Sequence, residues 1–467
     1  MKTKFKILAL FSLVAFMIGS ESCQKELFKQ PINALAPESA FDSPTHIEKS
    51  AIGMYSQLEN RDFFGGRVLV YADIRGDDVN LPAYFGNISL FNTLISTDGI
   101  VSDAWTGAYR TIGECNSFMD QLAPKASLIS AAKYAQYKGE AKFIRSLVYF
   151  YLVNFWAQPY RATADASQPG VPLVLNTTID PFGAANQLPR STVAQVYSQM
   201  ESDLKESESS LPADYKDPGF QNVARATQGA AQALLMRMYL YKGDYQNASL
   251  YADKLIGGRY ALNKTPEIPF KTYTTSESIF SVAHNGADNP NTNNALGAHY
   301  APDRRADINL SKSFIALLDT SRDLRYKNLV KTVSKQFWTT KYVGLTDWVP
   351  VLRYSEILLT KAEALANLSK TPDPAAITLI QQVRNRSNGG PLPTIVSQQD
   401  LISAVLKERK IELAFEGQGS FDYLRTGRDI PAHGVVGVQA YKSTFTVLPI
   451  PFYDVQKNPK LTQNSGY

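Results

Sequence analysis

Carboxylates near the C-terminus could in principle do acid–base chemistry. Glu408, Glu412 and Glu416 follow one another at intervals of four, which places them on one face of a helix. A glycosidase needs two carboxylates across a cleft, so such a pair is conceivable. The alternative is ion pairing within the helix packing, with arginines such as Arg384, Arg409 and Arg425. The density of arginines around these glutamates favours the structural role.

The same interpretation applies to two other pairs of opposite charge. Glu140 stands close to Arg145, and Glu356 close to Arg353, in segments whose neighbours are apolar. We therefore expect Glu140 to pair with Arg145 and Glu356 with Arg353.

Other catalytic motifs are missing from the sequence. It has no Gly-x-Ser-x-Gly elbow, phosphate-binding glycine loop or His-Glu-x-x-His pair, and its four histidines lack metal-ligand spacing. Cys115 falls within a helical pattern with no local signature of a catalytic thiol, so we interpret it as a small buried hydrophobe. The sequence predicts a protein that is not an enzyme and has neither a cofactor nor a catalytic metal.

The N-terminus has the pattern of an export signal. Three lysines precede an apolar stretch, residues 7–18, that is too short to span a bilayer. Small residues and then Cys23 follow, an arrangement typical of a bacterial lipoprotein whose cysteine is acylated. We predict a signal peptide over residues 1–22 and lipidation at Cys23; a secreted protein with an incidental cysteine is the alternative.

Composition limits the choice of partner and describes the surface. The chain has 467 residues, a net charge of +5 and 44% hydrophobic residues, enough for a sizeable core. Three of the positive charges lie in the signal segment, so the excess gives no support for a nucleic-acid partner. Charged residues make up only 19%, against a usual share of about 25%, whereas aromatic residues reach 11%. Such a surface is suited to stacking and hydroxyl hydrogen bonds.

Hydrophobic spacing predicts a mainly helical chain. Helices are expected at about 43–58, 100–122, 131–156, 192–209, 352–367 and 374–386, and from 397 to 417 with a capping box at its start. Residues 225–256 are expected to form two helices joined by a turn at 243–245. Further candidate pairs are 352–367 with 374–386 and 140–156 with 192–209. Small residues at Ala248 and Ala252 favour close antiparallel pairs of the tetratricopeptide kind, within about 131–256 and 352–416. Long irregular segments interrupt them at about 63–97, 284–309 and 336–350, and a short strand is expected at 278–282.

Four segments together resemble the SusD/RagB family of Bacteroidetes. They are GEAKFIRSLVYF at 139–150, RATQGAA at 225–231, VLRYSEILLTKAEA at 351–364 with VRNR at 383–386, and ERKIELAFEG at 408–417 with DYLR at 422–425. The C-terminus, from LPIP at 448–451 to QNSGY at 463–467, also resembles the family. Ser387-Asn388 and Gln418-Gly419 depart from its pattern. The order and spacing of these motifs cover nearly the whole of residues 23–467.

This resemblance implies one SusD-like domain over residues 23–467 and a role in nutrient capture. Such a lipoprotein would lie on the outer face of the outer membrane, bind an oligosaccharide and cover a SusC-like TonB-dependent transporter. Sugar rings stack on aromatic faces while their hydroxyls need polar partners. The candidate ligand contacts lie in the three irregular segments: Phe63, Phe64, Asp77, Asp78, Tyr84, Phe85, Tyr300, Arg304, Trp338 and Trp348.

Several alternatives stay open at this point. Each aromatic could instead pack in the core, as we expect for Trp105 and Trp156, and Asp77 or Asp78 could cap a turn. The asparagine-rich segment at 284–309 could bind sugar, hold a structural calcium ion or be a mobile surface loop. The cargo could be a peptide, and a tetratricopeptide scaffold or a helical glycosidase are further alternatives.

Overall fold

The computed structural model describes residues 39–82, 84–177, 180, 183–216 and 219–467. Residues 1–50 and 51–467 form two units, each described by itself. The predicted signal peptide and Cys23 lie outside the described residues. In the first unit, Ser43 caps the start of α2 (Pro44–Leu58) by accepting a hydrogen bond from the His46 N–H. Within the described ranges, every helix is too short or too polar to cross a bilayer.

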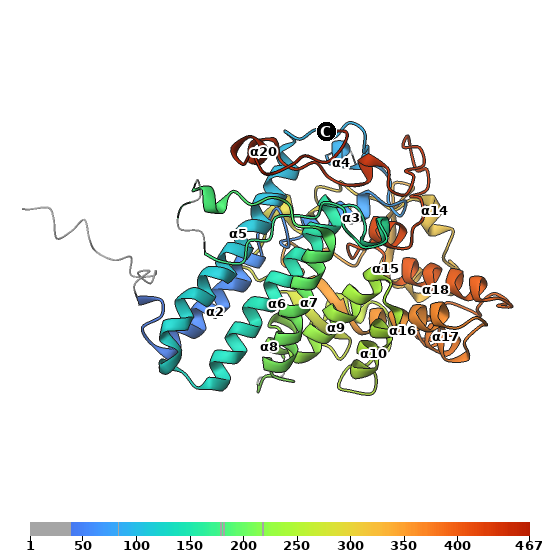
Figure 1. The fold of residues 1–467 in the computed structure, drawn as a ribbon. Coiled ribbons are helices and arrows are strands. Elements are labelled where there is room, and N and C mark those ends of the chain that lie inside the picture. Colours follow the sequence, from blue (N-terminus) through green and yellow to red (C-terminus); the bar gives the residue numbers. More distant parts are fainter. Residues whose placement is uncertain (1–38, 83, 178–179, 181–182, 217–218) are drawn as a thin grey trace, which may run out of the picture. The chain divides into compact units, whose positions relative to one another are not determined.

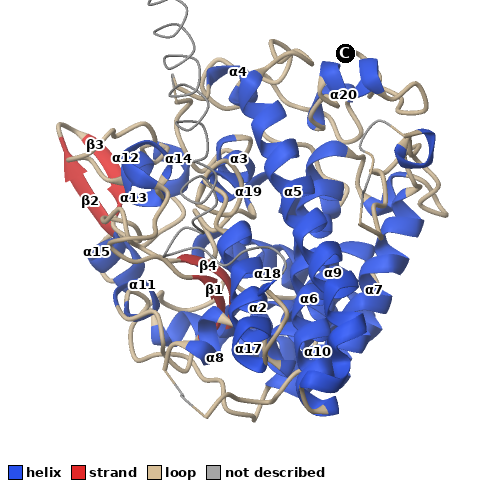
Figure 2. Cartoon of the chain, turned by 90° about the vertical axis from the view of Figure 1, so that its left-hand side faces the viewer, coloured by secondary structure: helices blue, strands red, loops and turns tan. Residues whose placement is uncertain are grey.

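The second unit is mainly helical, as the sequence predicts (Figure 2). Its long helices are α5 (Gly99–Leu122), α6 (Ala131–Trp156), α7 (Val193–Ser210), α9 (Gln228–Lys242), α10 (Tyr245–Leu255), α16 (Tyr354–Leu368), α17 (Pro374–Arg386) and α18 (Gln398–Glu412). Helix α6 packs on α7, α9 on α10, and α16 on α17, which are the three predicted pairs (Figure 1). Contacts of α7 with α9 and of α10 with α16 join these pairs into one continuous stack.

The pair α9 and α10 shows how local sequence sets this geometry. Thr227 caps α9 by accepting from the Ala230 N–H, and Gly243 ends it at a φ of 74°, which favours glycine. Asp244 then caps α10. Ala248 and Ala252 are fully buried, so the small side chains let the two helices approach closely.

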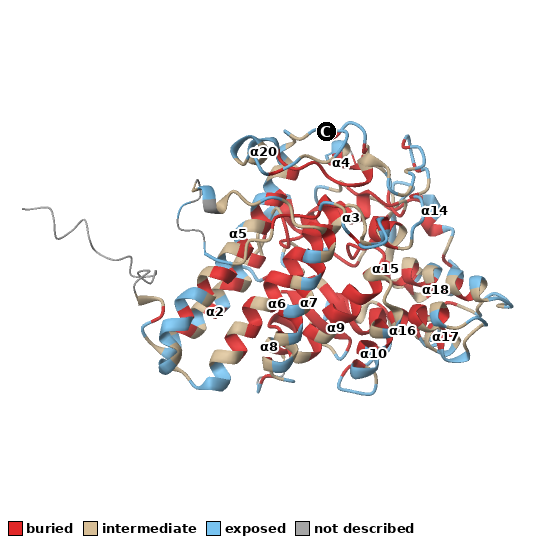
Figure 3. Cartoon of the chain, in the orientation of Figure 1, coloured by how far each residue is buried: buried red, intermediate tan, exposed pale blue. Residues whose placement is uncertain are grey.

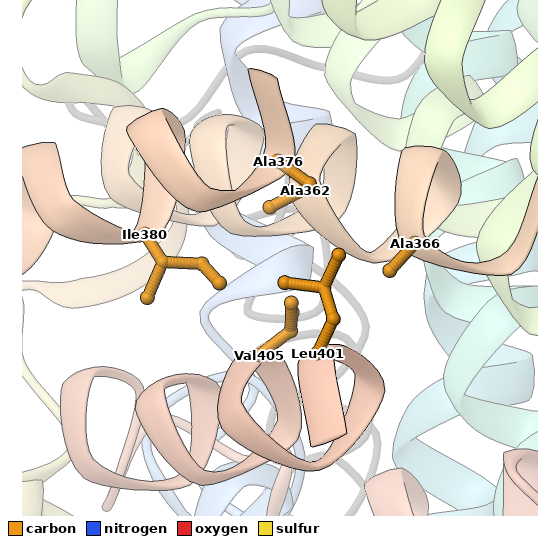
Figure 4. Close-up of a cluster of buried hydrophobic side chains, with 6 residues drawn as sticks. All are labelled: Ala362, Ala366, Ala376, Ile380, Leu401 and Val405. Carbon is orange, nitrogen blue, oxygen red and sulfur yellow. The ribbon is translucent and has the colours of Figure 1, made fainter. Parts of the chain in front are cut away.

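Alanines play the same part where α16, α17 and α18 meet. Figure 4 shows the side chains from the three helices converging on one another. The cluster consists of Ala362, Ala366, Ala376, Ile380, Leu401 and Val405. The predicted capping box is present at the start of α18, where Ser397 and Asp400 bond each other's backbone.

Strands are few and short. The predicted strand is present as β1 (Ser278–Val282) and pairs antiparallel with β4 (Val349–Arg353). β2 (Val330–Val333) and β3 (Gln336–Thr339) form a hairpin whose two turn residues, Ser334 and Lys335, have positive φ. The segment 336–350, expected to be an irregular loop, is therefore partly strand.

The other two expected loops also contain regular structure. Within 63–97 lie α3 (Arg67–Ile74) and α4 (Gly86–Ser89), and within 284–309 lie α12 (Asn291–Asn294) and α13 (Leu296–Tyr300). All eight residues of α3 are buried, so it has no polar face and no helical period in its sequence. Further short helices are α8 (Gln221–Ala224), α11 (Ile268–Lys271), α14 (Lys312–Ile315), α15 (Leu324–Leu329), α19 (Gly419–Arg425) and α20 (Phe452–Lys457), with 3₁₀ turns at Ala123–Leu128, Tyr160–Ala162, Ala184–Asn186 and Thr444–Thr446.

The C-terminal segment completes the core around the end of α6. The Trp156 Nε1–H donates to the Pro449 carbonyl at 2.9 Å, and the Leu448 N–H donates to the Phe155 carbonyl at 2.7 Å. The Asn464 side chain donates to the Trp156 carbonyl at 2.9 Å. Buried residues run through the middle of the helical stack (Figure 3) and include Trp105, Trp156 and Cys115, as predicted.

The glutamates of α18 and the turn after it lie in a buried charge network, which confirms their structural role. Glu408 pairs with Arg384 at 2.6 Å, as expected, and also with Arg325. Glu412 and Glu416 both accept from Arg353. We call this set, together with Glu277, Lys341 and Arg386, the Arg353 network.

The expected local pairs have other partners. Glu140 accepts from Arg225 at 2.8 Å, 85 residues along the chain, whereas Arg145 forms a two-pronged ion pair with Asp203. Glu356 likewise pairs with Arg237 at 2.7 Å. Arg409 and Arg425 pair with Glu363 and Asp422.

Candidate ligand-binding site

The structure brings two of the three predicted binding segments together around Tyr84. A pocket of about 450 Å³ opens here, within the size range of small-molecule sites. Its lining includes Arg61, Asp62, Arg67, Tyr84, Asp98, Asp103, Asn293 and Arg305. We call this space the Tyr84 pocket.

Tyr84 gives the pocket an aromatic surface. Its side chain is 42% exposed, and Phe85 meets the ring edge-on at 4.7 Å. The guanidinium carbon of Arg305 lies 4.3 Å from the ring centroid, a cation–π contact. The Arg67 Nη2–H donates to the Tyr84 hydroxyl at 3.0 Å. The ring is thus held in a fixed orientation while part of it stays open.

Arg67 links the tyrosine to the first acidic group. It is buried at the start of α3, and its Nη1–H donates to the Asp62 carboxylate at 2.8 Å. The preceding residue, Gly66, has a φ of 143°, and a Cβ there would lie 2.7 Å from the Asn294 carbonyl. Only glycine therefore lets segment 63–97 approach the asparagine-rich segment this closely.

Arg305 is held from the other side of the pocket. Its Nε–H donates to Asp307 at 2.9 Å and its Nη1–H to the Asn293 side chain at 3.1 Å. His299 lies 2.8 Å from the same Asp307 carboxylate. Burial acts to raise the pKa of Asp307, but hydrogen bonds from His299 and Arg305 outweigh it and hold the pKa below its ordinary value. Asp307 therefore stays ionised and fixes the position of Arg305.

Two further carboxylates come from the start of α5. Asp98 caps this helix by accepting from the N–H groups of Ile100 and Val101 at 3.0 and 3.2 Å. Burial, and next the negative charge of Asp62, raise the pKa of Asp103. The pocket thus offers hydrogen-bond donors and acceptors around one aromatic ring.

The asparagines of segment 284–309 mostly stabilise their own backbone. Asn285 accepts from the Ala287 and Asp288 N–H groups, Asn289 from the Asn291 N–H, and Asn291 in turn from the Asn293 N–H. These successive Asx turns account for the residue type. Among the residues that the structure describes, there is no cluster of three or more His, Cys, Asp or Glu that could hold a metal ion.

Four of the predicted ligand contacts are core residues. Phe63, Phe64, Phe85 and Tyr300 are all buried. Phe64 packs edge-on against Tyr151 of α6 at 4.9 Å, and the Tyr300 hydroxyl donates to Asp73 at 2.9 Å. The core-packing alternative describes these side chains, which present no open face to a ligand in this structure.

Trp338 and Trp348 do not line the Tyr84 pocket either. Trp338 is buried on β3, and Trp348 stacks on Tyr273 with ring centroids 5.0 Å apart. Arg304 is exposed, and its Nε–H donates to the Val343 carbonyl at 2.7 Å.

Asp77 and Asp78 line a different pocket of about 420 Å³ beside α18 and α19. Lys410 pairs with both carboxylates, at 3.0 Å from Asp78, and the Tyr423 hydroxyl donates to Asp77 at 2.9 Å. Both carboxylates therefore already have partners within the chain. Among the predicted ligand contacts, Tyr84 alone lines the Tyr84 pocket.

Reasoning from sequence missed most of the pocket. No local pattern in the sequence marks Asp62, Arg67, Asp98, Asp103 and Arg305 as pocket residues, because they come from separate segments that only the fold brings together. One signal is present for Arg67, since this arginine opens the largely apolar run RVLVYADI and needs a polar partner.

A stack of helical pairs with a polar, aromatic-floored pocket on its connecting segments defines a class of mainly helical binding proteins. Comparison with known proteins identifies the family. Residues 27–240 match a family described as starch-binding and associating with the outer membrane, and residues 322–467 match the SusD family. The chain belongs to the SusD/RagB family.

Individual relatives agree with this assignment. A SusD superfamily protein from Bacteroides fragilis has a crystal structure with a TM-score of 0.80 and 30% identity, covering 90% of this chain and 99% of that one. SusD-like protein P2 from Formosa agariphila is 26% identical over 99% of this chain and 100% of its own. The starch-binding protein SusD from Bacteroides thetaiotaomicron is 22% identical over 76% of each.

Proposed function

We propose that this protein binds an oligosaccharide in the Tyr84 pocket. The observation that carries the proposal is the half-open tyrosine ring, fixed by Arg67 and Arg305 within a pocket lined by carboxylates, guanidinium groups and amides. A sugar ring places its C–H face on an aromatic ring and its hydroxyls on such polar groups. The starch-binding relative and the description of the matching family support a glycan as the ligand.

The proposal is tested by affinity electrophoresis against soluble starch, a β-1,3-glucan and other polysaccharides. We expect Tyr84→Ala to weaken binding to the retained glycan about tenfold or more, equivalent to about 1.4 kcal/mol. Tyr453→Ala is the matched control, because Tyr453 is an exposed tyrosine on α20 outside the pocket. Equal retention of Tyr84→Ala and wild type would reject the Tyr84 pocket as the glycan site.

The same experiment separates the alternative cargoes. A peptide mixture that binds while every polysaccharide fails would replace the glycan by a peptide. Binding of partner proteins alone, unaffected by Tyr84→Ala, would favour a scaffold in which the helical groove is the interface.

We further propose a binding role without catalysis. Glu408, Glu412 and Glu416 are enclosed by arginines and Lys341 in the Arg353 network, so the carboxylates that resembled an acid–base pair have no access to a substrate. Prolonged incubation with the bound glycan should release no shorter products. Release of reducing ends would contradict the proposal.

The proposed setting is the outer face of the outer membrane, with lipidation at Cys23 as the anchor and a SusC-like TonB-dependent transporter as the recipient of the ligand. The family description, which associates its members with the outer membrane, supports this setting. Cys23→Ser should move the protein from the membrane to the soluble fraction. Wild type should co-purify with a large β-barrel in mild detergent; purification without one would count against the transporter.

A further inference from the structure

A second pocket, separate from the Tyr84 pocket, lies beside β1 and α8. Its volume is about 270 Å³, many times that of one water molecule. One part of its wall is apolar and includes Ile52, Phe220, Ala224, Phe280 and Val282. Phe220 is braced edge-on by Trp348 at 5.3 Å. We call this space the Phe220 pocket.

His284 supplies an unused acceptor in the lining of this pocket. The residue is only 5% exposed, and its Nδ1 lies 2.9 Å from the Asp347 carbonyl. Because a carbonyl only accepts, Nδ1 carries the hydrogen and Nε2 is left with a lone pair. Burial lowers the pKa of His284, which favours this neutral form. Nε2 has no hydrogen-bond partner in the described part of the chain, an uncommon condition for a buried polar atom.

Two carboxyl groups lie in the same lining. Glu59 Oε2 is buried and also has no partner among the described residues. Asp288 is held by the Asx turn of Asn285, whose side chain accepts from the Asp288 N–H at 3.0 Å. Burial first, and then repulsion and a hydrogen bond with Asp288, raise the pKa of Glu59 to about 8. At neutral pH the Glu59 carboxyl group therefore stays protonated.

The basic group beside them is already engaged. Arg225 donates to Glu140 at 2.8 and 3.1 Å, and the Tyr55 hydroxyl donates to the same carboxylate at 2.7 Å. Among the described ion pairs, none joins Glu59 or Asp288 to a lysine or arginine. The Phe220 pocket thus combines two carboxyl groups without a basic partner in the described ranges and the free His284 Nε2 with an apolar wall.

We propose that the Phe220 pocket binds a primary alkylammonium group, the chemistry of a lysine side chain. An ammonium carries three N–H donors, which match the three acceptors Glu59, Asp288 and His284 Nε2. The alkyl stem then packs on the wall around Phe220. When the cation enters, the proton of Glu59 leaves: one R–NH₃⁺ is bound and one H⁺ is released, so the net charge of the pocket is unchanged and the Glu59 carboxylate becomes an acceptor for the ammonium.

Calorimetry with n-butylammonium on the full chain tests this site, with n-butanol as the neutral probe of the same length. We expect the amine to bind at least tenfold more tightly than the alcohol. Titrations near pH 7 in two buffers of different ionisation enthalpy should show close to one proton released per amine. Equal affinities of amine and alcohol, or no proton release, would overturn the proposal.

Variants locate the effect. Glu59→Gln should weaken n-butylammonium binding at least tenfold and abolish proton release. Asp288→Asn should do the same, and because Asp288 is exposed this change leaves the core untouched. Asp303→Asn, an exposed carboxylate outside the pocket, is the control and should bind as wild type does. Wild-type affinity in both pocket variants would refute the site.

The source of the amine is distinguished by a second set of probes. A short lysine peptide is compared with the same peptide bearing acetyl-lysine, which has lost its positive charge. Binding of the lysine peptide alone supports the proposal with a protein side chain as the source, whereas binding of n-butylammonium but of neither peptide supports it with a free amine. Glycan affinity should be unchanged in Glu59→Gln, so failure here is distinguishable from failure of the proposed glycan function.

Discussion

The Arg353 network and the Tyr84 pocket are both rich in arginine and carboxylate, yet they differ in what their charges face. Arg353 is 3% exposed, and its donors reach Glu277, Glu412 and Glu416 at 2.6 to 2.9 Å. In the Tyr84 pocket the arginines instead hold an aromatic ring that is 42% exposed. Charge density alone therefore does not identify a binding site; the fixed polar groups around an open ring are what support the proposed glycan site.

The largest effect is expected from breaking the closed region. Arg353→Met leaves Glu412 and Glu416 buried beside fewer positive charges, and loss of one partner of a buried ion pair costs about 3–5 kcal/mol. Chemical denaturation should show a fall of this size in the free energy of unfolding. Arg304→Met, on an exposed arginine, is the control and should stay within about 0.5 kcal/mol. A loss under 1 kcal/mol for Arg353→Met would show that the network contributes little.

Acid should weaken the same region next. Burial acts to raise the pKa of Glu412, but the charges of Arg386, Arg353 and Arg325 outweigh it and hold this pKa well below its ordinary value of 4.5. The pKa of Glu416 is also lowered. A depressed pKa in the folded state contributes stability that is present above the unfolded value and is lost as the pH falls through the folded one. Unfolding free energies measured from pH 6 to pH 3 should therefore fall below about pH 4.5, and less steeply in Glu412→Gln. Identical slopes in both proteins would contradict this origin.

The smallest effect on folding, with a clear effect on binding, is expected in the open region. Arg305→Met removes the cation–π contact with Tyr84 and the bond to Asn293. Exposed contacts of this kind are worth about 0.5–1 kcal/mol, so glycan affinity should fall about two- to fivefold. The free energy of unfolding should fall by at most about 1 kcal/mol, far less than in Arg353→Met. If Arg305→Met destabilised the protein as much as Arg353→Met, the contrast between the two regions would fail.

Local features of the fold were predictable from the sequence. The α9–α10 pair follows from Thr227, Gly243 and Asp244, whose cap and turn preferences depend only on neighbouring residues. The capping box at Ser397 and the strand at 278–282 were predicted on the same basis. Helix α3 was missed for a physical reason, since burial on every side removes the polar face that a helical period requires.

Long-range pairing was not predictable in the same way. The ionic role of Glu140 followed from its apolar surroundings, but its partner Arg225 lies 85 residues away while Arg145 is close in sequence. The Tyr84 pocket shows the same limit, because Arg67, Asp98 and Arg305 meet only once three segments are folded together. Aromatic residue type indicates candidate ligand contacts in the sequence, but only the exposed fraction of each side chain distinguishes Tyr84 from the buried Phe63 and Tyr300.

The contacts of the C-terminal segment set an order on folding. The helical pairs are local in sequence and can form as soon as each is synthesised, whereas the bond from Trp156 to Pro449 closes a separation of 293 residues. The last hydrogen bonds at the end of α6 therefore form only after the residues around Pro449 have been synthesised and have docked. We expect the helical stack to assemble first and the region around Trp156 to become protected late, when the last twenty or so residues dock.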